Sequence, residues 1–564
     1  MAAAEPPASP ASTTFDARAR GARGRWAMWA LLALSLLMFA PGIASLPVTD
    51  RDEARYAQAS RQMAESGDYV HIRFQDEPRN KKPVGAYWLQ ATAARITDEV
   101  GSGAIWPYRL PSLIGATFAV LLLFGLARPA YGPSTAFLAA GVLGASVLAA
   151  SEARLAKTDA LLLATAVAAQ VALVRIYILR ANAETTRPGL AAVFWIAQGL
   201  AILVKGPVIP FVSLMTVLGL AVTDRKTRWL GGLRPLWGVP LALAIAAPWF
   251  VAISVADSGF IQESVGQDLI PKLLGIQEQH GGWPGTYLLL APLTLWPGSL
   301  LLVPALIVAW HERARPEVRA LLAWLIPAWI VLEAIPTKLP HYVLPLYPAL
   351  ALLVARAAVE RSAEIAGVLR RISGRIWLGV WTVIGIGLAA LGIAAAVSLH
   401  ASDALIPAIA LLAAALALTV GALILASRGN AAGALGFAVA LAVPFHALLF
   451  AGVAPRLDAL WLSRAAAQAV AAHSGLETTV ATAGYSEPSL VFALGTHTML
   501  SGAKGAADAL ADGRAALALV EDRESAAFRA EAERLGLHPR ELATVQGLNY
   551  SRGQNTVLRL YGGG

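Results

Sequence analysis

The sequence predicts a mainly α-helical polytopic membrane protein with a small α/β domain at its C-terminal end. Hydrophobic residues make up 57% of the 564 residues and charged residues only 14%, whereas soluble domains carry about 25% charged residues. The apolar residues gather in runs of roughly the length that crosses a bilayer. From about Leu457 onward, these runs give way to short segments with alternating patterns.

Charge and cysteine content exclude several classes of function. The formal net charge is +9, but the cations stand mostly in short links between apolar runs, where orientation in the membrane explains them. We therefore expect no nucleic-acid site. The chain has no cysteine, which excludes disulfides and thiolate metal sites, so any domain outside the cytoplasm depends on its hydrophobic core alone.

The N-terminal segment sets the predicted orientation. Residues 1–25 are rich in Ala, Pro and Arg and are expected to be disordered, and an apolar run starts at Trp26. No convincing cleavage site follows this run, so it is predicted to be an uncleaved first span. The arginines before it place the N-terminus in the cytoplasm and the following segment on the outer face.

Further apolar runs bring the predicted number of spans to about thirteen. They begin near Leu110, Ser134, Asp159, Gly189, Pro207, Leu236, Tyr287, Leu321, Val343, Ile376, Ala404 and Ala432. Alternation across the membrane then puts most basic links on the cytoplasmic side, as the positive-inside bias requires. The odd number of spans places the C-terminus outside, and the short spans around Lys205 are expected to be broken or re-entrant.

The domain boundaries follow from this pattern. Residues 26–456 are predicted to form the transmembrane domain, with residues 47–105 as its first outer loop. Residues 457–564 are predicted to form a periplasmic α/β domain, because 478–483 and 516–521 have strand patterns and 525–535 form an amphipathic helical pattern.

The charged segment from Thr49 to Trp88 is the first candidate for the seat of chemistry. It contains Asp50, Asp52, Glu53, Arg55, Lys81 and Lys82. Ionisable groups at a bilayer surface are costly unless they face water, one another or a ligand, so they indicate a functional site. The alternative is a solvated loop with snorkelling cations.

Other predicted outer links also carry unusual residues, and all are expected to converge on one face. These links are residues 152–159 (EARLAKTD), 257–286 and 338–342 (KLPHY). An enzyme working at this face needs cations for a phosphate leaving group and a carboxylate that positions or deprotonates a hydroxyl. The candidates for the first role are Lys81, Lys82, Lys338, His341 and Tyr342, and those for the second are Asp50 and Asp159.

Several of these residues also have structural explanations. Asp52 and Arg55 could form a helix-surface ion pair, and Glu53 could cap the same helix. Asp159 could cap another helix together with Thr158. Lys205 could be an interfacial anchor beside the break at Gly206 and Pro207, and His280 could be an ordinary loop histidine. Asp50 and Asp52 could bind a divalent cation through oxygen. Nothing in the sequence requires a metal or another cofactor.

Five strings in order carry a family resemblance: TDRDEARYAQASRQMAESGDY, KKPVGAYWLQA, RLAKTDALLL, GLAILVKGP and KLPHYVLPLYPALALL. Across residues 26–353 the chain resembles bacterial glycosyltransferases that use a polyprenyl-phosphate-linked sugar. This group comprises the lipid A aminoarabinose transferase and its protein mannosyltransferase relatives, glycosyltransferase families 39 and 83.

The resemblance implies a GT-C fold with juxtamembrane helices in the first outer loop. It also implies inverting transfer of a sugar from undecaprenyl phosphate to lipid A, another envelope glycan or a protein, at the periplasmic face of the bacterial inner membrane.

The resemblance also assigns roles to individual residues. Asp50 would be the principal catalytic carboxylate, Asp159 would line the sugar or acceptor pocket, Lys81 or Lys82 would hold the lipid phosphate, and Lys338 and Tyr342 would complete that site. Arg55 and Lys205 are weaker candidates for the phosphate, and Asp52, Glu53 and His341 are possible substrate contacts. The link 257–286 departs from the expected pattern, because Lys272 is its only cation.

A flippase or transporter of lipid-linked precursors is the competing hypothesis. A transporter is expected to place charges within spans near the midplane and often to show repeated halves. Here the charges gather at span ends and no repeat is evident, which favours the enzyme. A third hypothesis is a catalytically inactive scaffold that binds a partner through its C-terminal domain.

Overall fold

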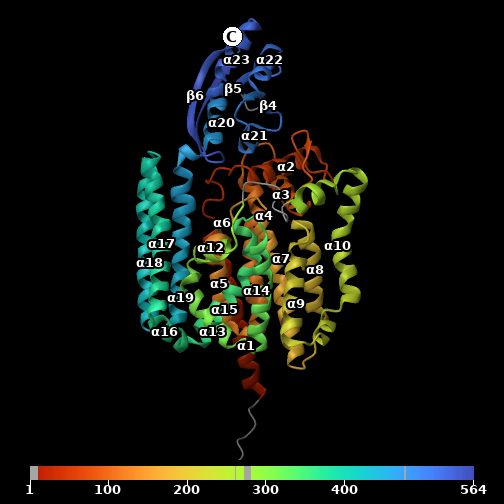
Figure 1. Cartoon of the computed structure of the whole chain (residues 1–564), viewed down its shortest axis with the longest axis vertical. Helices are drawn as coiled ribbons and strands as arrows, with labels where there is room; N and C mark the ends of the chain where they lie inside the picture. The colour runs from red at the N-terminus through yellow and green to blue at the C-terminus, as the bar shows by residue number, and fades with distance from the viewer. Residues whose placement is uncertain (1–9, 261, 272–280, 475–477, 564) are drawn as a thin grey trace, which may run out of the picture.

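The computed structural model describes residues 10–260, 262–271, 281–474 and 478–563. It is mainly helical, as predicted. Long helices stand side by side in a bundle, and the C-terminal α/β domain sits on one end of it, while the N-terminal helix leaves the bundle at the opposite end (Figure 1).

The helices of the membrane part have the following bounds: α1 (Pro10–Phe39), α2 (Asp52–Ser66), α3 (Gly85–Ile96), α4 (Trp106–Tyr131), α5 (Pro133–Ala145), α6 (Val147–Glu152), α7 (Asp159–Ala181), α8 (Pro188–Lys205), α9 (Val208–Asp224), α10 (Pro235–Ala256), α12 (Thr286–Thr294), α13 (Leu302–His311), α14 (Pro316–Ala334), α15 (Tyr347–Glu360), α16 (Ser362–Arg370), α17 (Ile372–Ser398), α18 (Ser402–Ser427) and α19 (Ala431–Ala447). Short 3-10 or π turns are η1 (Arg228–Leu233), η2 (Gln262–Leu269), η3 (Gly298–Leu301), η4 (Pro340–Leu346), η5 (Leu448–Val453), η6 (Ala454–Arg456) and η7 (Asp458–Leu460). A two-stranded ribbon pairs β1 (Arg73–Phe74) with β2 (Glu77–Pro78).

The chain is a polytopic membrane protein, but the expected number of about thirteen spans is not confirmed. Among the described residues, 8 helices are long and apolar enough to cross a membrane, or 9 if the bent pair Thr286–Thr294 and Gly298–His311 is one span. Each predicted run does lie in or next to a helix. Two of these helices, α5 and α9, have only 13 and 17 residues, and at about 1.5 Å per residue they fall short of a bilayer core of about 30 Å.

The first helix differs from the expectation for residues 1–25. Helix α1 begins at Pro10 rather than at Trp26. The helix therefore includes residues 10–25, and the disorder expected for residues 1–25 stays a prediction.

The segment predicted as the first outer loop contains the helical pair that the resemblance implied. Helices α2 and α3 pack through stacked rings of Tyr56 and Tyr87, whose centroids are 4.9 Å apart. The Ser60 hydroxyl donates a hydrogen bond of 2.8 Å to Gln90 inside the same contact. Their shared core continues onto Leu203 of α8 and Trp249 of α10, so the pair rests on the ends of the membrane helices.

The C-terminal domain is a three-layer α/β unit. Its sheet has the order β4-β3-β5-β7-β6, with β3 parallel to β4 and β5 and the remaining neighbours antiparallel. Residues of α20 and α21 share a core with one face of the sheet, and those of α22 and α23 with the other. Central strands β3 and β5 are buried on both faces, which explains why their sequences are mainly apolar, apart from Thr482 and the final Glu521, rather than alternating.

The bounds of this domain agree with the sequence-based strands and helix: α20 (Leu462–His473), β3 (Val480–Ala483), α21 (Pro488–Leu494), β4 (Met499–Ser501), α22 (Ala503–Ala511), β5 (Leu517–Glu521), α23 (Asp522–Arg534), β6 (Arg540–Asn549) and β7 (Gln554–Gly562). Helix α21 lies next to α2 at the junction with the bundle (Figure 1). There the Phe492 ring packs edge-on against Tyr108 of α4, with centroids 5.5 Å apart.

Candidate active site

The predicted outer links meet at the end of the bundle that carries the C-terminal domain. Hydrogen bonds join these links or residues beside them: the Asn80 side chain bonds Asp257 at 2.7 Å, and the Ala156 N–H bonds Glu53 at 2.9 Å. The Gly282 N–H bonds the carbonyl oxygen of Pro336, two residues before Lys338, at 3.0 Å. The expectation that segments far apart in sequence converge on one face is therefore confirmed.

A group of buried and half-buried charged residues lies where these links meet the membrane helices, and we call it the charge cluster: Glu152, Lys157, Asp159, Lys205 and His341. Helix α7 begins at Asp159 and α8 ends at Lys205. The Lys205 Nζ atom is 2.6 Å from Asp159 Oδ1. On the other side, Lys157 Nζ donates a hydrogen bond of 3.0 Å to Glu152.

The imidazole of His341 lies between the two carboxylates of the charge cluster. Its Nδ1 is 3.7 Å from Glu152 Oε1 and its Nε2 is 4.0 Å from Asp159 Oδ1. The neighbouring Tyr342 ring faces Lys205, with Nζ 5.6 Å from the ring centroid. The structure thus brings together predicted site residues from three separate parts of the chain.

These contacts decide between the alternatives for Asp159 and Lys205. No side-chain capping bond is found at the start of α7, so Asp159 is not a helix cap with Thr158. Its carboxylate is instead paired with Lys205, and both side chains are largely buried. Lys205 is therefore an ion-pair partner rather than a snorkelling anchor.

The loop that precedes α7 has unusual electrostatics. Burial raises the pKa of the Glu152 carboxyl, although nearby Lys157 opposes this. Burial by itself lowers the pKa of Lys157, but the Glu152 and Asp159 carboxylates raise it overall. Glu152 is therefore the more easily protonated partner, while Lys157 stays charged. Shifts of this kind, set by burial and specific partners, are typical of functional sites.

A cavity of about 320 Å³ opens beside the charge cluster, and we call it the lysine groove. Its charged residues are Lys81, Lys82 and Lys205, and most of the remaining lining is apolar, with Ser264 as a further polar residue: Pro83, Ile202, Gly206, Pro207, Pro210, Phe250, Phe260 and Ser264. It shares Ile202 and Pro210 with a second, almost wholly apolar cavity of about 300 Å³ between α8, α9 and α10. A cavity with three lysines that adjoins an apolar cavity suits a ligand with an anionic head group and a long apolar tail.

Two glycines allow the lysine groove to form. A Cβ atom on Gly85, the first residue of α3, would lie 2.8 Å from the Leu203 carbonyl oxygen. Only glycine therefore lets the start of α3 approach the end of α8 so closely. Gly206 has a φ of 67° and ends α8 directly after Lys205, in a backbone region that other residues rarely adopt.

Asp52 lies near the charge cluster but belongs to a different element, helix α2. It is the first residue of α2, it is exposed, and no hydrogen bond or ion pair to its carboxylate is found in the described part of the chain. The predicted ion pair with Arg55 is not formed. The Asp52 carboxylate nevertheless contributes to the field at Lys157 and His341.

Two arginines surround this carboxylate. Burial and the neighbouring Arg79 guanidinium lower the pKa of Arg55, and Asp52 acts in the opposite direction. The Arg79 guanidinium lies over the Tyr56 ring at 5.5 Å. Arg79 was missed by the sequence analysis, and its position just before Lys81 in a charged segment was the available signal.

Asp50 lies only two residues before Asp52 in the chain, but its surroundings are different. Its carboxylate accepts a hydrogen bond from the Ser489 hydroxyl, and its backbone N–H donates to the Tyr550 hydroxyl at 2.7 Å. Burial raises the pKa of Asp50 to about 6, against the lowering effect of Ser489. The predicted catalytic carboxylate is therefore held by the C-terminal domain and is not part of the charge cluster.

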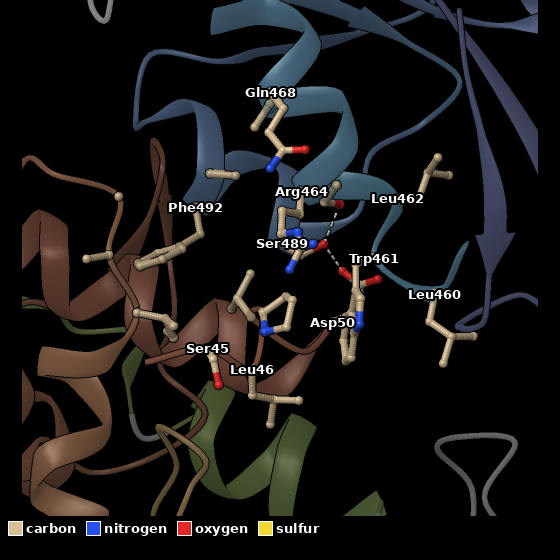
Figure 2. Close-up of a pocket in the computed structure, with 18 of the residues that line it drawn as sticks. Ser45, Leu46, Asp50, Leu460, Trp461, Leu462, Arg464, Gln468, Ser489 and Phe492 are labelled. Carbon is tan, nitrogen blue, oxygen red and sulfur yellow. Dashed lines mark hydrogen bonds between the residues drawn. The ribbon is translucent and has the colours of Figure 1, made fainter. Parts of the chain in front are cut away.

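The Asp50 side chain lines a third cavity, of about 440 Å³, between the segments 44–50 and 102–105 and the C-terminal domain. Figure 2 shows Asp50 and Ser489 pointing toward each other, with Arg464 and Gln468 of α20 above them. Trp461 also lines this space.

Glu53 was predicted as a possible substrate contact, and the structure corrects this. Its two carboxylate oxygens accept hydrogen bonds of 2.7 and 2.9 Å from Arg109, and both side chains are 0% exposed. The remaining Arg109 donors bind the carbonyl oxygens of Ile43, Leu46 and Pro47. Glu53 is therefore a structural residue that anchors α2 to α4.

Lys338 is also placed differently from the expectation. Its ammonium donates hydrogen bonds of 2.7 Å to the carbonyl oxygens of Glu333 and Ile335 and lies 5.3 Å from the Tyr287 ring centroid. It closes the C-terminal end of α14, and the structure does not bring it together with Lys81 and Lys82 in the lysine groove.

The remaining expectations concern metal binding and the link 257–286. Within the described ranges, no group of three or more His, Asp or Glu side chains is arranged to hold a metal ion. Lys272 and His280 lie outside the residues that the structure describes.

Comparisons with known proteins agree with this architecture. Residues 81–251 match the family described as dolichyl-phosphate-mannose-protein mannosyltransferase. The chain is 30% identical over 353 residues to an undecaprenyl phosphate-alpha-4-amino-4-deoxy-L-arabinose arabinosyl transferase of Pseudomonas paraeruginosa, a match covering 61% of this chain and 63% of the relative. The protein of the same description from Yersinia pestis is 28% identical over 368 residues, covering 63% and 65%. The matches thus span less than two thirds of these relatives.

Solved structures extend the likeness to nearly the whole chain. ArnT from Cupriavidus metallidurans in the apo state superposes with a TM-score of 0.73 at 20% identity, covering 96% of this chain and 98% of that one. The same protein bound to undecaprenyl phosphate gives 0.74 at 19% identity, covering 94% and 97%. The chain has the GT-C fold. It resembles the polyprenyl-phosphate-dependent glycosyltransferases, with ArnT as the structural counterpart.

Proposed function

We propose that this protein is a glycosyltransferase that moves a sugar from a polyprenyl phosphate to an acceptor at the outer face of the bacterial inner membrane. The observation that carries the proposal is the lysine groove, which adjoins both a buried charge cluster and an apolar cavity between membrane helices. The names of the relatives support undecaprenyl phosphate as the lipid and aminoarabinose as the first sugar to test.

The donor lipid fits the two joined cavities. Its phosphate would sit among Lys81, Lys82 and Lys205, where charge-assisted hydrogen bonds to phosphate oxygens are strong. Its isoprenoid tail would follow the apolar cavity between α8, α9 and α10. The sugar, attached to the phosphate, would then extend toward the charge cluster and Asp52.

Lys205 connects binding to chemistry. In the transfer, the bond between the anomeric carbon and the phosphate oxygen breaks, and a bond to the acceptor oxygen forms on the opposite face of the sugar. Negative charge grows on the departing lipid phosphate, and fixed cations stabilise it because they need no reorganisation. The 2.6 Å pair with Asp159 holds the Lys205 ammonium in place for this role.

Asp52 is the carboxylate best placed to act on the acceptor. It is exposed and lies among Arg55, Arg79 and Lys157. With a hydroxyl acceptor it would take the proton as general base, and with an already ionised phosphate acceptor it would instead orient it or stabilise positive charge on the sugar. The role of Asp50 as principal catalytic carboxylate stays a prediction.

The orientation in the membrane belongs to the same proposal. The transmembrane domain of residues 26–456 would carry the chemistry, with the N-terminus in the cytoplasm. Residues 457–564 would lie in the periplasm, where they cover the face on which the acceptor arrives.

The test is release of free polyprenyl phosphate by purified protein supplied with undecaprenyl phosphate-linked aminoarabinose or mannose and with lipid A. We expect release by the wild type and a loss of about hundredfold or more in Lys82→Gln and Asp52→Asn. Lys226→Gln is the matched control, because Lys226 is exposed and follows the other end of α9.

The outcomes separate the competing hypotheses. Absence of release together with movement of these lipids between vesicle leaflets would establish the flippase. Mass spectrometry of envelope lipids from cells with wild-type protein, Asp50→Asn or a gene deletion identifies the acceptor. If one modification is absent only after deletion, Asp50 is not catalytic. If Asp52→Asn cells also keep it, the scaffold hypothesis gains support.

A further inference from the structure

The turn that precedes α2 is held by the C-terminal domain through three separate contacts. The Ser489 hydroxyl donates to the Asp50 carboxylate. The Asp50 N–H donates to the Tyr550 hydroxyl at 2.7 Å, and Arg51 Nη2 donates to the Ser551 carbonyl oxygen at 2.9 Å. Each contact joins residues more than 400 positions apart in the chain.

The backbone of this turn is strained. Arg51, the residue before α2, has a φ of 64°, which is uncommon for a residue other than glycine. Such a conformation persists only where the surrounding structure enforces it, and it is often found at functional sites. The next residue is Asp52, so the conformation of the turn sets the direction of the Asp52 carboxylate.

The residues of the C-terminal domain that contact the turn are themselves held by further contacts. Ser489 also hydrogen-bonds Ser463 of α20 at 2.6 Å. The Tyr550 ring packs edge-on against Trp461, with centroids 6.3 Å apart. On its other side, the start of α2 is held by the buried pair of Glu53 and Arg109. The C-terminal domain therefore holds the turn at Asp50 and Arg51, and the membrane helices hold the start of α2 at Glu53.

We propose that the C-terminal α/β domain positions the acceptor-side carboxylate of the site, with Ser489 and Tyr550 as positioning residues that clamp the Asp50–Arg51 turn. This inference rests on the proposed function, because it assigns a purpose to the direction of Asp52. It gives the C-terminal domain a part in the transfer that does not require it to touch the donor or acceptor.

The experiment compares the double variant Ser489→Ala/Tyr550→Phe with Tyr561→Phe. Tyr561 is the matched control, because it is a buried tyrosine of the same domain whose hydroxyl has no hydrogen-bond partner among the described residues. A misplacement of about 1 Å at a catalytic group can cost about a hundredfold in rate. We expect kcat to fall at least tenfold in the double variant while KM for the lipid donor changes less than twofold, and we expect Tyr561→Phe to match the wild type.

Rescue distinguishes positioning from general damage. Ser489→Thr keeps the hydroxyl donor, so in a chain with native Tyr550 it is expected to retain most of the wild-type kcat. The proposal is overturned if the double variant keeps the wild-type kcat, or if Tyr561→Phe lowers kcat to the same extent.

Hydrogen–deuterium exchange gives a readout independent of activity. The peptide that spans residues 47–56 should exchange faster in the double variant, because the Asp50 amide loses its acceptor. Exchange of this peptide should be unchanged in Tyr561→Phe. If the wild type transfers no sugar, the proposed function fails, whereas this exchange experiment still tests the clamp. Unchanged exchange in the double variant contradicts the clamp whatever the activity.

Discussion

Two buried ionic groups of this protein differ in how completely their charges are satisfied. Glu53 and Arg109 form one closed unit, in which each carboxylate oxygen and each guanidinium nitrogen has a partner. The charge cluster is less closed, because His341 approaches its carboxylates no nearer than 3.7 Å and Lys205 also lines an open cavity.

This difference separates a structural site from a functional one. A fully hydrogen-bonded pair holds helices together and leaves no group available to a ligand. A cluster whose cations also face a cavity keeps electrostatic capacity for an anion. The hydrogen bonds of a charged residue near a membrane surface therefore distinguish a structural role from a catalytic one.

The largest expected effect comes from breaking the closed unit. Arg109→Met leaves the Glu53 carboxylate buried without its partner, which costs about 3–5 kcal/mol of stability. We expect most of this variant to be lost from the monodisperse, detergent-extracted fraction. The double variant Glu53→Gln/Arg109→Met removes both charges and should recover part of the loss. Equal losses in the single and double variants would mean that the pair is not what anchors α2.

Opening the charge cluster should affect activity more than folding. Lys205→Gln removes a cation from the lysine groove but keeps a hydrogen-bond donor for Asp159. Loss of one preorganised donor typically costs about 10²–10³ in rate, so turnover at saturating donor should fall by that factor. Extraction yield and melting temperature serve as the controls for folding, and a turnover within threefold of wild type would remove Lys205 from the site.

A smaller effect is expected from widening the contact that forms the lysine groove. Gly85→Ala places a methyl group 2.8 Å from the Leu203 carbonyl oxygen, so α3 must move away from α8 and carry Lys82 with it. We expect KM for the donor lipid to rise by about tenfold, a loss of about 1.4 kcal/mol. Gly101→Ala is the control, since no atom lies within 4 Å of a Cβ built there. An unchanged KM would show that this close approach is not needed for donor binding.

The smallest effect concerns pH at the junction with the C-terminal domain. Burial raises the pKa of Asp50 from 3.8 to about 6, so the folded state holds this proton more tightly than the unfolded state. Its stabilising contribution is complete below about pH 4 and is lost as the pH rises through about 6. Thermal unfolding should therefore show a decline in stability from pH 5 to pH 7 that is weaker in Asp50→Asn, which still accepts a bond from Ser489. The same slope in both proteins would contradict the shift.

Local patterns were sufficient for much of the fold. Apolar runs placed helices at each expected position, and the runs around residues 480 and 517 gave β3 and β5 in the C-terminal domain. Hydropathy and strand patterns act over a few residues, so a sequence displays them directly. The number of spans was less certain, because α5 and α9 are short for a bilayer.

Part of the candidate site could also be predicted from the sequence. Alternation of spans placed distant links on one face, which predicted the meeting of Asp159, Lys205 and His341. It did not predict the partner of each charge. Glu53 pairs with Arg109, 56 residues away, and Lys338 binds the carbonyl oxygens that end α14.

What the sequence determined by itself is the class of molecule, the side on which the charges gather and the α/β character of its C-terminal domain, because these follow from composition and local periodicity. The tertiary structure alone decided that Asp50 meets Ser489, 439 residues later, and that Asp52 is left among cations. Packing sets such pairings through long-range contacts and burial, and no local pattern in the chain encodes them.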